Sequence, residues 1–199
     1  MVSEEIKEIA RKLIVFSRRI YERNLTYGCG GNLSMRINDK IFITPSKGLS
    51  RTMLDFDENE VIILDESGNV IHPCGAIKPS IEMRMHLLIY KNRKDVNAII
   101  HAHPPYTIIA SRFPRIIEQA KRETGEFYWT FVTVPYYPPG SSELATAVAN
   151  AAEKTDIIIL IDHGIVTLGK TLEEAYVKLE EMEMRIKITI IRHLIRASL

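Results

Sequence analysis

Asn97-Ala98-Ile99-Ile100-His101-Ala102-His103 is an apolar run that ends in two histidines, and Pro104-Pro105 follows it directly. The run predicts a buried β-strand, and the prolines end it because they cannot donate to a strand ladder. Residues two apart on a strand point to the same face, so the two imidazoles are expected side by side. Such a pair at the end of a strand is typical of a metal site.

A third histidine, His163, follows a second apolar run over 157–161. It lies in Asp162-His163-Gly164, where the strand is expected to break. With His101 and His103 it predicts a three-nitrogen metal site that keeps an open position, as catalytic sites do. Ordinary core or surface histidines are the alternative, and the third histidine favours the metal. All-nitrogen ligation favours Zn²⁺, with cobalt, iron or manganese as alternatives.

Glu82 begins a helix-like segment after Lys78-Pro79-Ser80-Ile81. A carboxylate in the first turn of a helix is often only a favourable charge near the helix dipole. Beside three histidines, a general acid/base is the better interpretation. His86 lies four residues later on the same helix face, where it could orient Glu82. We expect it mainly to pack.

Two turn segments have the composition of anion-binding loops. Gly30-Gly31-Asn32-Leu33-Ser34 offers backbone amides and a side-chain amide, and Thr44-Pro45-Ser46-Lys47-Gly48 offers hydroxyls, amides and an ammonium group. Ser80 lies at a helix N-terminus, which favours anions. Together with a metal site, these segments indicate a phosphorylated small substrate.

The pattern of elements predicts one α/β or α+β domain over 1–199, with a mostly antiparallel sheet flanked by helices. Strands are expected at 33–37, 40–44, 60–65, 70–71, 97–102, 128–134, 156–161 and 165–168. Helices are expected at 3–23, from 80 to about 92, at 106–123 with a break at Pro114, at 141–154 and from 171 onward. Turn residues at 38–39 and 66–69 predict two hairpins.

Composition excludes several classes of function. The 199 residues are 46% hydrophobic and carry a net charge of +1, which argues against a nucleic-acid-binding surface. The longest apolar runs are too short to span a membrane, and the N-terminus has no signal-peptide pattern. The two cysteines, Cys29 and Cys74, are too few for a disulfide framework, so we expect a reduced, cytoplasmic setting.

Five segments, in this order, resemble the class II aldolase/adducin-head family over nearly the whole chain. They are Gly30-Gly31-Asn32-Leu33-Ser34, Ile43-Thr44-Pro45-Ser46, Pro79-Ser80-Ile81-Glu82, His101-Ala102-His103-Pro104 and His163-Gly164. The resemblance implies a nine-stranded, mostly antiparallel sheet between helical layers. It also implies a homotetramer with sites near the subunit interfaces.

The resemblance also implies roles for the residues of the site. It makes His101, His103 and His163 the ligands of one Zn²⁺, and Glu82 the catalytic acid/base that also ligates zinc when no substrate is bound. It places the substrate phosphate on Gly31, Asn32, Ser46, Lys47 and Ser80. The implied reaction cleaves a ketose 1-phosphate similar to L-fuculose 1-phosphate into dihydroxyacetone phosphate and an aldehyde. A zinc-stabilised enediolate carries the reaction, without a lysine Schiff base.

The chain departs from this pattern at three places. Ile81 stands where the aldolases usually have a second serine, and Lys47 is an extra cation in the second loop. The aldolases use a tyrosine from a neighbouring subunit to protonate the aldehyde oxygen, and this chain has no clear match to it, Tyr128 being the nearest.

These departures keep three alternatives open. One is a dehydratase acting on methylthioribulose 1-phosphate, which shares a lead-in like Lys78-Pro79-Ser80. The second is a ribulose-phosphate 4-epimerase, and the aspartate usual in the place of Glu82 counts against it. The third is an adducin-like module that binds protein partners, and the three histidines count against it because such modules tend to lose the metal ligands.

Overall fold

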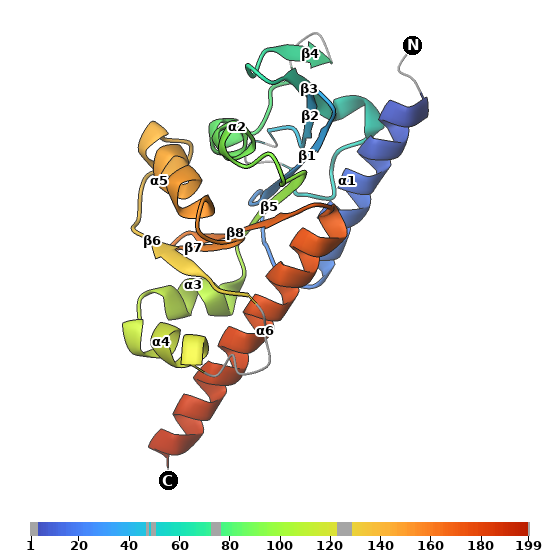
Figure 1. Ribbon diagram of the computed structural model, residues 1–199. Coiled ribbons are helices and arrows are strands. Elements are labelled where there is room, and N and C mark those ends of the chain that lie inside the picture. Colours follow the sequence, from blue (N-terminus) through green and yellow to red (C-terminus); the bar gives the residue numbers. More distant parts are fainter. Residues whose placement is uncertain (1–3, 47, 49–50, 73–76, 123–128, 199) are drawn as a thin grey trace.

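The structure, a computed structural model, describes residues 4–46, 48, 51–72, 77–122 and 129–198 (Figure 1). The helices are α1 (Glu4–Glu22), α2 (Met83–Asn92), α3 (Pro105–Ser111), α4 (Pro114–Arg122), α5 (Ser142–Ala152) and α6 (Leu172–Ala197), with a 3₁₀ turn at Glu58–Glu60. The strands are β1 (Asn32–Ile37), β2 (Lys40–Ile43), β3 (Ile62–Asp65), β4 (Val70–His72), β5 (Ala98–Ala102), β6 (Val132–Val134), β7 (Ile157–Leu160) and β8 (Gly164–Gly169).

The eight strands form one sheet in the order β4-β3-β2-β1-β5-β8-β7-β6. Neighbouring strands are antiparallel except β6 and β7, which are parallel. The mostly antiparallel α/β architecture is therefore confirmed. The family-based expectation of nine strands differs from the eight in the described residues, where Pro45 and Pro79 also form an isolated bridge.

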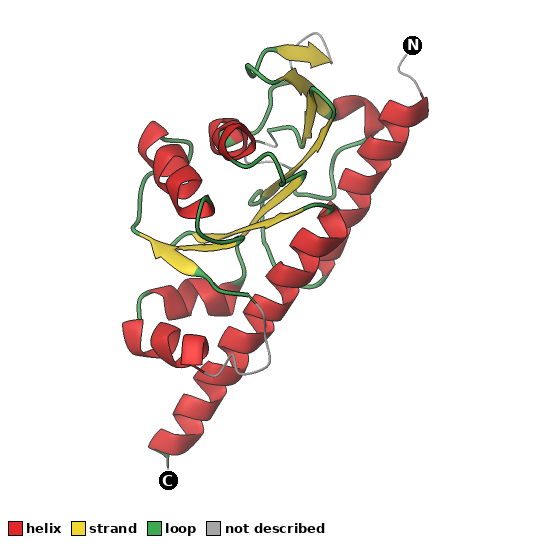
Figure 2. Cartoon of the chain, in the orientation of Figure 1, coloured by secondary structure: helices red, strands yellow, loops and turns green. Residues whose placement is uncertain are grey.

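Helices cover both faces of the sheet, as Figures 1 and 2 show. The alternation along β7 reveals the layers, because Ile157 and Ile159 belong to the core shared with α1 and α6. Ile158 and Leu160 belong to the core shared with α2 and α5. Strands buried on both faces read as continuous apolar runs, as this one does. No helix in the described part of the chain is long and apolar enough to cross a membrane.

Several element boundaries follow from local chemistry. The Ser141 and Thr171 side chains cap α5 and α6 by accepting hydrogen bonds from the backbone N–H of Leu144 and Glu174. The helical segment expected at 106–123 breaks before Pro114, as predicted. The strand expected at 60–65 begins only at Ile62, since a capping box closes the preceding 3₁₀ turn.

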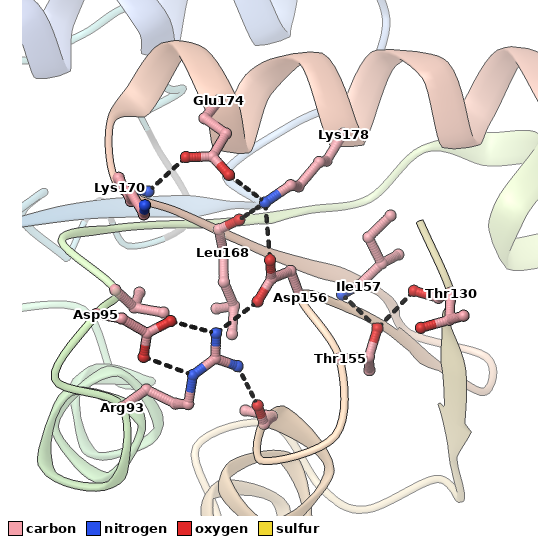
Figure 3. Close-up of polar contacts among 12 residues, drawn as sticks. Arg93, Asp95, Thr130, Thr155, Asp156, Ile157, Leu168, Lys170, Glu174 and Lys178 are labelled. Carbon is pink, nitrogen blue, oxygen red and sulfur yellow. Dashed lines mark hydrogen bonds and ion pairs between the residues drawn. The ribbon is translucent and has the colours of Figure 1, made fainter. Parts of the chain in front are cut away.

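A chain of ion pairs that includes the buried Lys178 ammonium joins the layers at one end of β7 and β8 (Figure 3). The Lys178 side chain is 1% exposed, and its Nζ donates to Asp156 Oδ2 at 2.9 Å, Leu168 O at 2.8 Å and Glu174 Oε1 at 2.7 Å. Asp156 also accepts from Arg93, at the end of α2, at 2.8 Å. A buried ammonium needs this full set of acceptors, so the network holds α6 and α2 to the same end of these two strands.

Candidate active site

The three histidines of the sequence motif lie together at one end of the sheet. His101 is on β5, His103 follows that strand directly, and His163 lies in the turn between β7 and β8. Strand β8 lies between β5 and β7, so the turn that enters β8 reaches the end of β5. The sequence prediction that these side chains converge is confirmed by the geometry.

The histidine nitrogens form a compact donor set. One ring nitrogen from each of His101, His103 and His163 lies within 4.8 Å of the others, and the Nε2 atoms of His101 and His103 are 3.0 Å apart. His101 is fully buried, and its Nδ1 lies 3.0 Å from the Ile165 carbonyl oxygen. A carbonyl can only accept, so Nδ1 carries the proton and Nε2 faces the cluster. This is the arrangement usual for histidine ligands of metals.

His103 is held between two glycines. A Cβ built on Gly30 would lie 2.1 Å from His103 Nδ1, and one built on Gly164 would lie 2.8 Å from His103 Cδ2. Both are shorter than real Cβ contacts. Only a glycine at position 30 therefore leaves enough room for the His103 imidazole. The sequence pattern had suggested only an anion-binding role for this segment.

Glu82 directs its carboxylate at the histidines. It occupies the N-cap position of α2 but makes no side-chain capping hydrogen bond, so capping does not account for the direction of its side chain. Its Oε2 is 3.1 Å from His101 Nε2 and its Oε1 is 3.5 Å from His163 Nε2. The residue is 6% exposed, and Oε1 has no hydrogen-bond partner among the described residues. A buried carboxylate oxygen in this state needs a proton or a cation nearby.

This donor set fits a divalent cation. Three imidazoles and one carboxylate are ligands that Zn²⁺ accepts, with the carboxylate at the position that a substrate would take. Burial lowers the pKa of His163 and favours its neutral form, which is the form that binds metal. Glu82 Oε1, which lacks a hydrogen bond in the described structure, is a further indication of a cation.

A pocket of about 650 Å³ opens beside Glu82, His103 and His163. The predicted phosphate-binding residues Gly31, Asn32, Ser46 and Ser80 all line it, while Lys47 lies outside the described residues. Ser80 Oγ accepts a hydrogen bond from the Glu82 backbone N–H at 3.3 Å, so its own proton can point into the pocket. The anion-binding segments and the histidines thus share one cavity.

Asn32 contacts the carboxylate and His86 contacts Asn32, in a way that the sequence did not reveal. Asn32 Nδ2 donates to Glu82 Oε2 at 2.8 Å, and Asn32 Oδ1 lies 2.6 Å from His86 Nε2. His86 Nδ1 lies 2.7 Å from Ser34 Oγ. His86 is therefore hydrogen-bonded rather than merely packed, and its link to Glu82 runs through Asn32.

Other residues of the pocket were not predicted as site residues. Tyr27, Cys29 and Tyr136 line it, and no motif distinguishes them in the sequence. Tyr128, the nearest match to the family tyrosine, lies outside the described residues. Asp162 adopts the left-handed backbone conformation (φ 59°), which turns the chain sharply just before His163.

Comparisons with known proteins agree with this geometry. The family model described as class II aldolase and adducin N-terminal domain matches residues 11–190. A protein named L-fuculose phosphate aldolase, from Methanocaldococcus jannaschii, is 37% identical over 186 residues, covering 94% of this chain and 98% of its own. A protein named 3-oxo-tetronate 4-phosphate decarboxylase, from Haemophilus influenzae, is 32% identical over 189 residues, covering 91% and 87%.

A solved structure described as L-fuculose 1-phosphate aldolase is also similar. It superposes with a TM-score of 0.79 at 28% sequence identity, covering 98% of this chain and 89% of its own. The sequence and the fold therefore lead to the same group of proteins.

Proposed function

The chain belongs to the class II aldolase and adducin N-terminal domain family, and we propose that it is a zinc-dependent aldolase that cleaves a ketose 1-phosphate. The proposed substrate is of the L-fuculose 1-phosphate type, and the products are dihydroxyacetone phosphate and an aldehyde. A divalent metal is typical of class II aldolases, and this chain keeps a full donor set for one. The complete set argues against an adducin-like binding module.

The observation that carries the proposal is the placement of Glu82. A carboxylate at the first turn of a helix normally caps it, but Glu82 Oε1 and Oε2 face His163 and His101 instead. The carboxylate is buried, borders the pocket and has one oxygen without a hydrogen bond. These are the properties of a base that exchanges a proton with a substrate.

His101, His103 and His163 would hold the zinc ion, with Glu82 as a fourth ligand when no substrate is bound. The ion supplies a Lewis acid that stabilises negative charge developing on substrate oxygens. The hydrogen bond from His101 to the Ile165 carbonyl fixes the tautomer of that ligand.

Proton movement in the pocket follows from the residues that line it. When the C3–C4 bond of the ketose breaks, C3 must receive a proton, and Glu82 Oε1 delivers it. In the reverse direction the same oxygen removes it. The proton of the C4 hydroxyl must leave as the aldehyde forms. Tyr27 and Tyr136 line the pocket, and either phenol could accept this proton while passing its own to solvent water. Solvent water also supplies the proton that Glu82 delivers, so one proton enters and one leaves in each cleavage.

The phosphate group is proposed to bind among Gly31, Asn32, Ser46 and Ser80, with Lys47 adding charge. The net charge of +1 means that binding depends on local donors rather than on the field of the whole protein. Ser80 hydroxyl and the amides at the start of α2 supply such donors.

A homotetramer is also proposed. Helix α6 carries exposed apolar side chains along its second half, which is a surface suited to burial in an assembly. They are Met184, Ile188, Ile191, Leu194 and Ile195. Analytical ultracentrifugation tests this, and a monomer at micromolar concentration would contradict it.

The test of the reaction is turnover of zinc-loaded protein with L-fuculose 1-phosphate, L-ribulose 1-phosphate and methylthioribulose 1-phosphate, followed by mass spectrometry of the products. We expect dihydroxyacetone phosphate, lost with chelator and in His103→Ala. Glu82→Gln should lower kcat by about 10²–10⁴-fold while keeping the metal. Loss of water without carbon–carbon cleavage would replace the aldolase by the dehydratase. Full turnover of Glu82→Gln would remove the role given to Glu82.

A further inference from the structure

Behind Glu82, five buried polar side chains alternate between α2 and β1. In spatial order they are Glu82, Asn32, His86, Ser34 and Tyr90, and we call them the polar ladder. The contacts are 2.8 Å from Asn32 Nδ2 to Glu82 Oε2, 2.6 Å from His86 Nε2 to Asn32 Oδ1, 2.7 Å from Ser34 Oγ to His86 Nδ1 and 2.8 Å from Ser34 Oγ to Tyr90 Oη. All five are buried.

The alternation follows from matching repeats. Glu82, His86 and Tyr90 are four residues apart, which places them on one helix face with a rise of about 6.0 Å per step. Asn32 and Ser34 are two apart on one face of a strand, with a rise of about 6.6 Å. A helix lying along a strand can therefore insert each of its residues between successive strand residues.

The hydrogen-bond directions in the ladder are determined by one end of it. The Glu82 carboxylate can only accept, so Asn32 must turn its NH₂ group toward it and its carbonyl toward His86. His86 Nε2 must then carry the proton, and Nδ1 accepts from the Ser34 hydroxyl. Ser34 Oγ in turn accepts from the Tyr90 hydroxyl. Each of Asn32, His86, Ser34 and Tyr90 thus donates one hydrogen bond to the next residue of the ladder in the direction of the carboxylate.

Burial supports a neutral, fixed imidazole. His86 is fully buried, and burial lowers its pKa to about 4. Glu82, whose charge favours protonation of His86, has the smaller effect. Burial also raises the pKa of Tyr90, so its hydroxyl keeps its proton. His86 and Tyr90 are therefore neutral, and they can fix the orientation of the Glu82 carboxylate without adding charge near it.

We propose that His86 is a positioning residue for Glu82, acting through Asn32. Its Nε2–H holds the Asn32 carbonyl, and this keeps the Asn32 NH₂ group on Glu82 Oε2. The carboxylate is then anchored by Oε2 and presents Oε1, which lacks a hydrogen-bond partner in the described part of the chain, to the pocket. Without His86 the Asn32 amide would be held at one end only, and it could rotate away from Glu82 Oε2. This inference rests on the proposed function of Glu82 as the proton-transferring group.

The competing interpretation is that the ladder only attaches α2 to the sheet. Both interpretations predict a loss of stability when His86 is replaced. Only the positioning role predicts a lower kcat. It also predicts that a replacement with one donor and one acceptor restores kcat, and that the loss disappears when Asn32 is absent.

Kinetics on L-fuculose 1-phosphate with metal-loaded protein would separate them. We expect His86→Leu to lower kcat at least tenfold with KM within about twofold, and His86→Gln to restore kcat to within about threefold. In an Asn32→Ala background, His86→Leu should change kcat by less than twofold. Thr167→Val is the matched control, because it removes a buried hydrogen bond to the Ala175 carbonyl on α6 (2.9 Å), away from the pocket. It should leave kcat unchanged.

Nitrogen-15 NMR of the metal-free protein gives a readout independent of turnover and of whether any variant folds. The Nε2–H tautomer of His86, unchanged between pH 6 and 8, is expected. A proton on Nδ1 would reverse the ladder and overturn the inference.

The kinetic outcomes also separate this inference from the proposed function. Wild-type kcat in Glu82→Gln would overturn both. An inactive Glu82→Gln beside a fully active His86→Leu would overturn the positioning role alone. Three other results would also overturn the positioning role alone. They are an equal loss of kcat from His86→Leu in the Asn32→Ala background, a kcat that His86→Gln does not restore, and an equal loss of kcat in Thr167→Val.

Discussion

Adding one methyl group at Gly30 should remove His103 from the metal site. The new Cβ would lie 2.1 Å from His103 Nδ1 and 2.6 Å from Cε1, whereas ordinary contacts begin at 3.4 Å. The ring must therefore move by about 1.3 Å. That is more than half of a Zn–N bond of about 2.0–2.1 Å. Gly164 also lies close to the ring, since a Cβ built on it would be 2.8 Å from His103 Cδ2.

The expected magnitude follows from the loss of one of three imidazole ligands. Changes behind a ligand already weaken metal binding by about 10–100-fold. Gly30→Ala displaces the ligand itself, so we expect at least about 100-fold weaker binding, or about 2.7 kcal/mol. The fold should persist, because φ of Gly30 is not in the left-handed region and alanine is allowed there. Competition with a chromogenic chelator measures the dissociation constant, and circular dichroism measures the fold.

Gly28→Ala is the matched control. Gly28 has φ +56°, and nothing lies within 4 Å of the place that a Cβ would take, so alanine strains the backbone without touching His103. We expect a stability loss of about 1–2 kcal/mol with unchanged metal affinity. Wild-type zinc affinity in Gly30→Ala, or an equal loss in Gly28→Ala, would refute the steric argument.

Three further predictions concern stability. Lys178→Met should lower the free energy of unfolding by about 3 kcal/mol, because the buried Leu168 carbonyl and two partly exposed carboxylates lose the ammonium that they share; urea titration checks this, with the exposed Lys170→Met, expected within about 0.5 kcal/mol, as control. His86 has its pKa lowered to about 4 by burial, so between about pH 6.5 and 4 the unfolded chain binds a proton that the native state does not. Wild-type stability should therefore fall by about 2 kcal/mol more than that of His86→Gln from pH 7 to 5, and equal losses would contradict the burial effect. Zinc at a hundred times its dissociation constant should add about 2.7 kcal/mol at pH 7, and a melting temperature unchanged by chelator would argue against a native metal site.

Much of the fold and the centre of the site could be read from the sequence because local periodicity reports them. The alternation around His101 and His103 predicted a strand end with two side chains on one face, and the structure confirms it. The helices expected from 141 and from 171 begin where predicted, because the Ser141 and Thr171 side chains cap them. The predicted start of β3 was too early, because a short 3₁₀ turn precedes that strand.

The support around the site could not be read in the same way, because it depends on how elements pack. Nothing local to Asn32 indicates that its amide meets Glu82, which is fifty residues away in the sequence. The glycine-rich segment suggested anion binding, whereas Gly30 also leaves room for an imidazole from another strand. The resemblance implied nine strands, and the described residues form eight.

The matched spacing of α2 and β1 also limits where this chain can change in length. One residue inserted between Glu82 and His86 would turn His86 and Tyr90 about 100° around the helix axis, away from β1. A deletion between Asn32 and Ser34 would move the remaining side chain to the other face of the sheet. An insertion in the exposed hairpin turn at 66–69 would disturb neither repeat. Loop tips can therefore vary in length, while these two segments cannot gain or lose a residue without breaking the polar ladder.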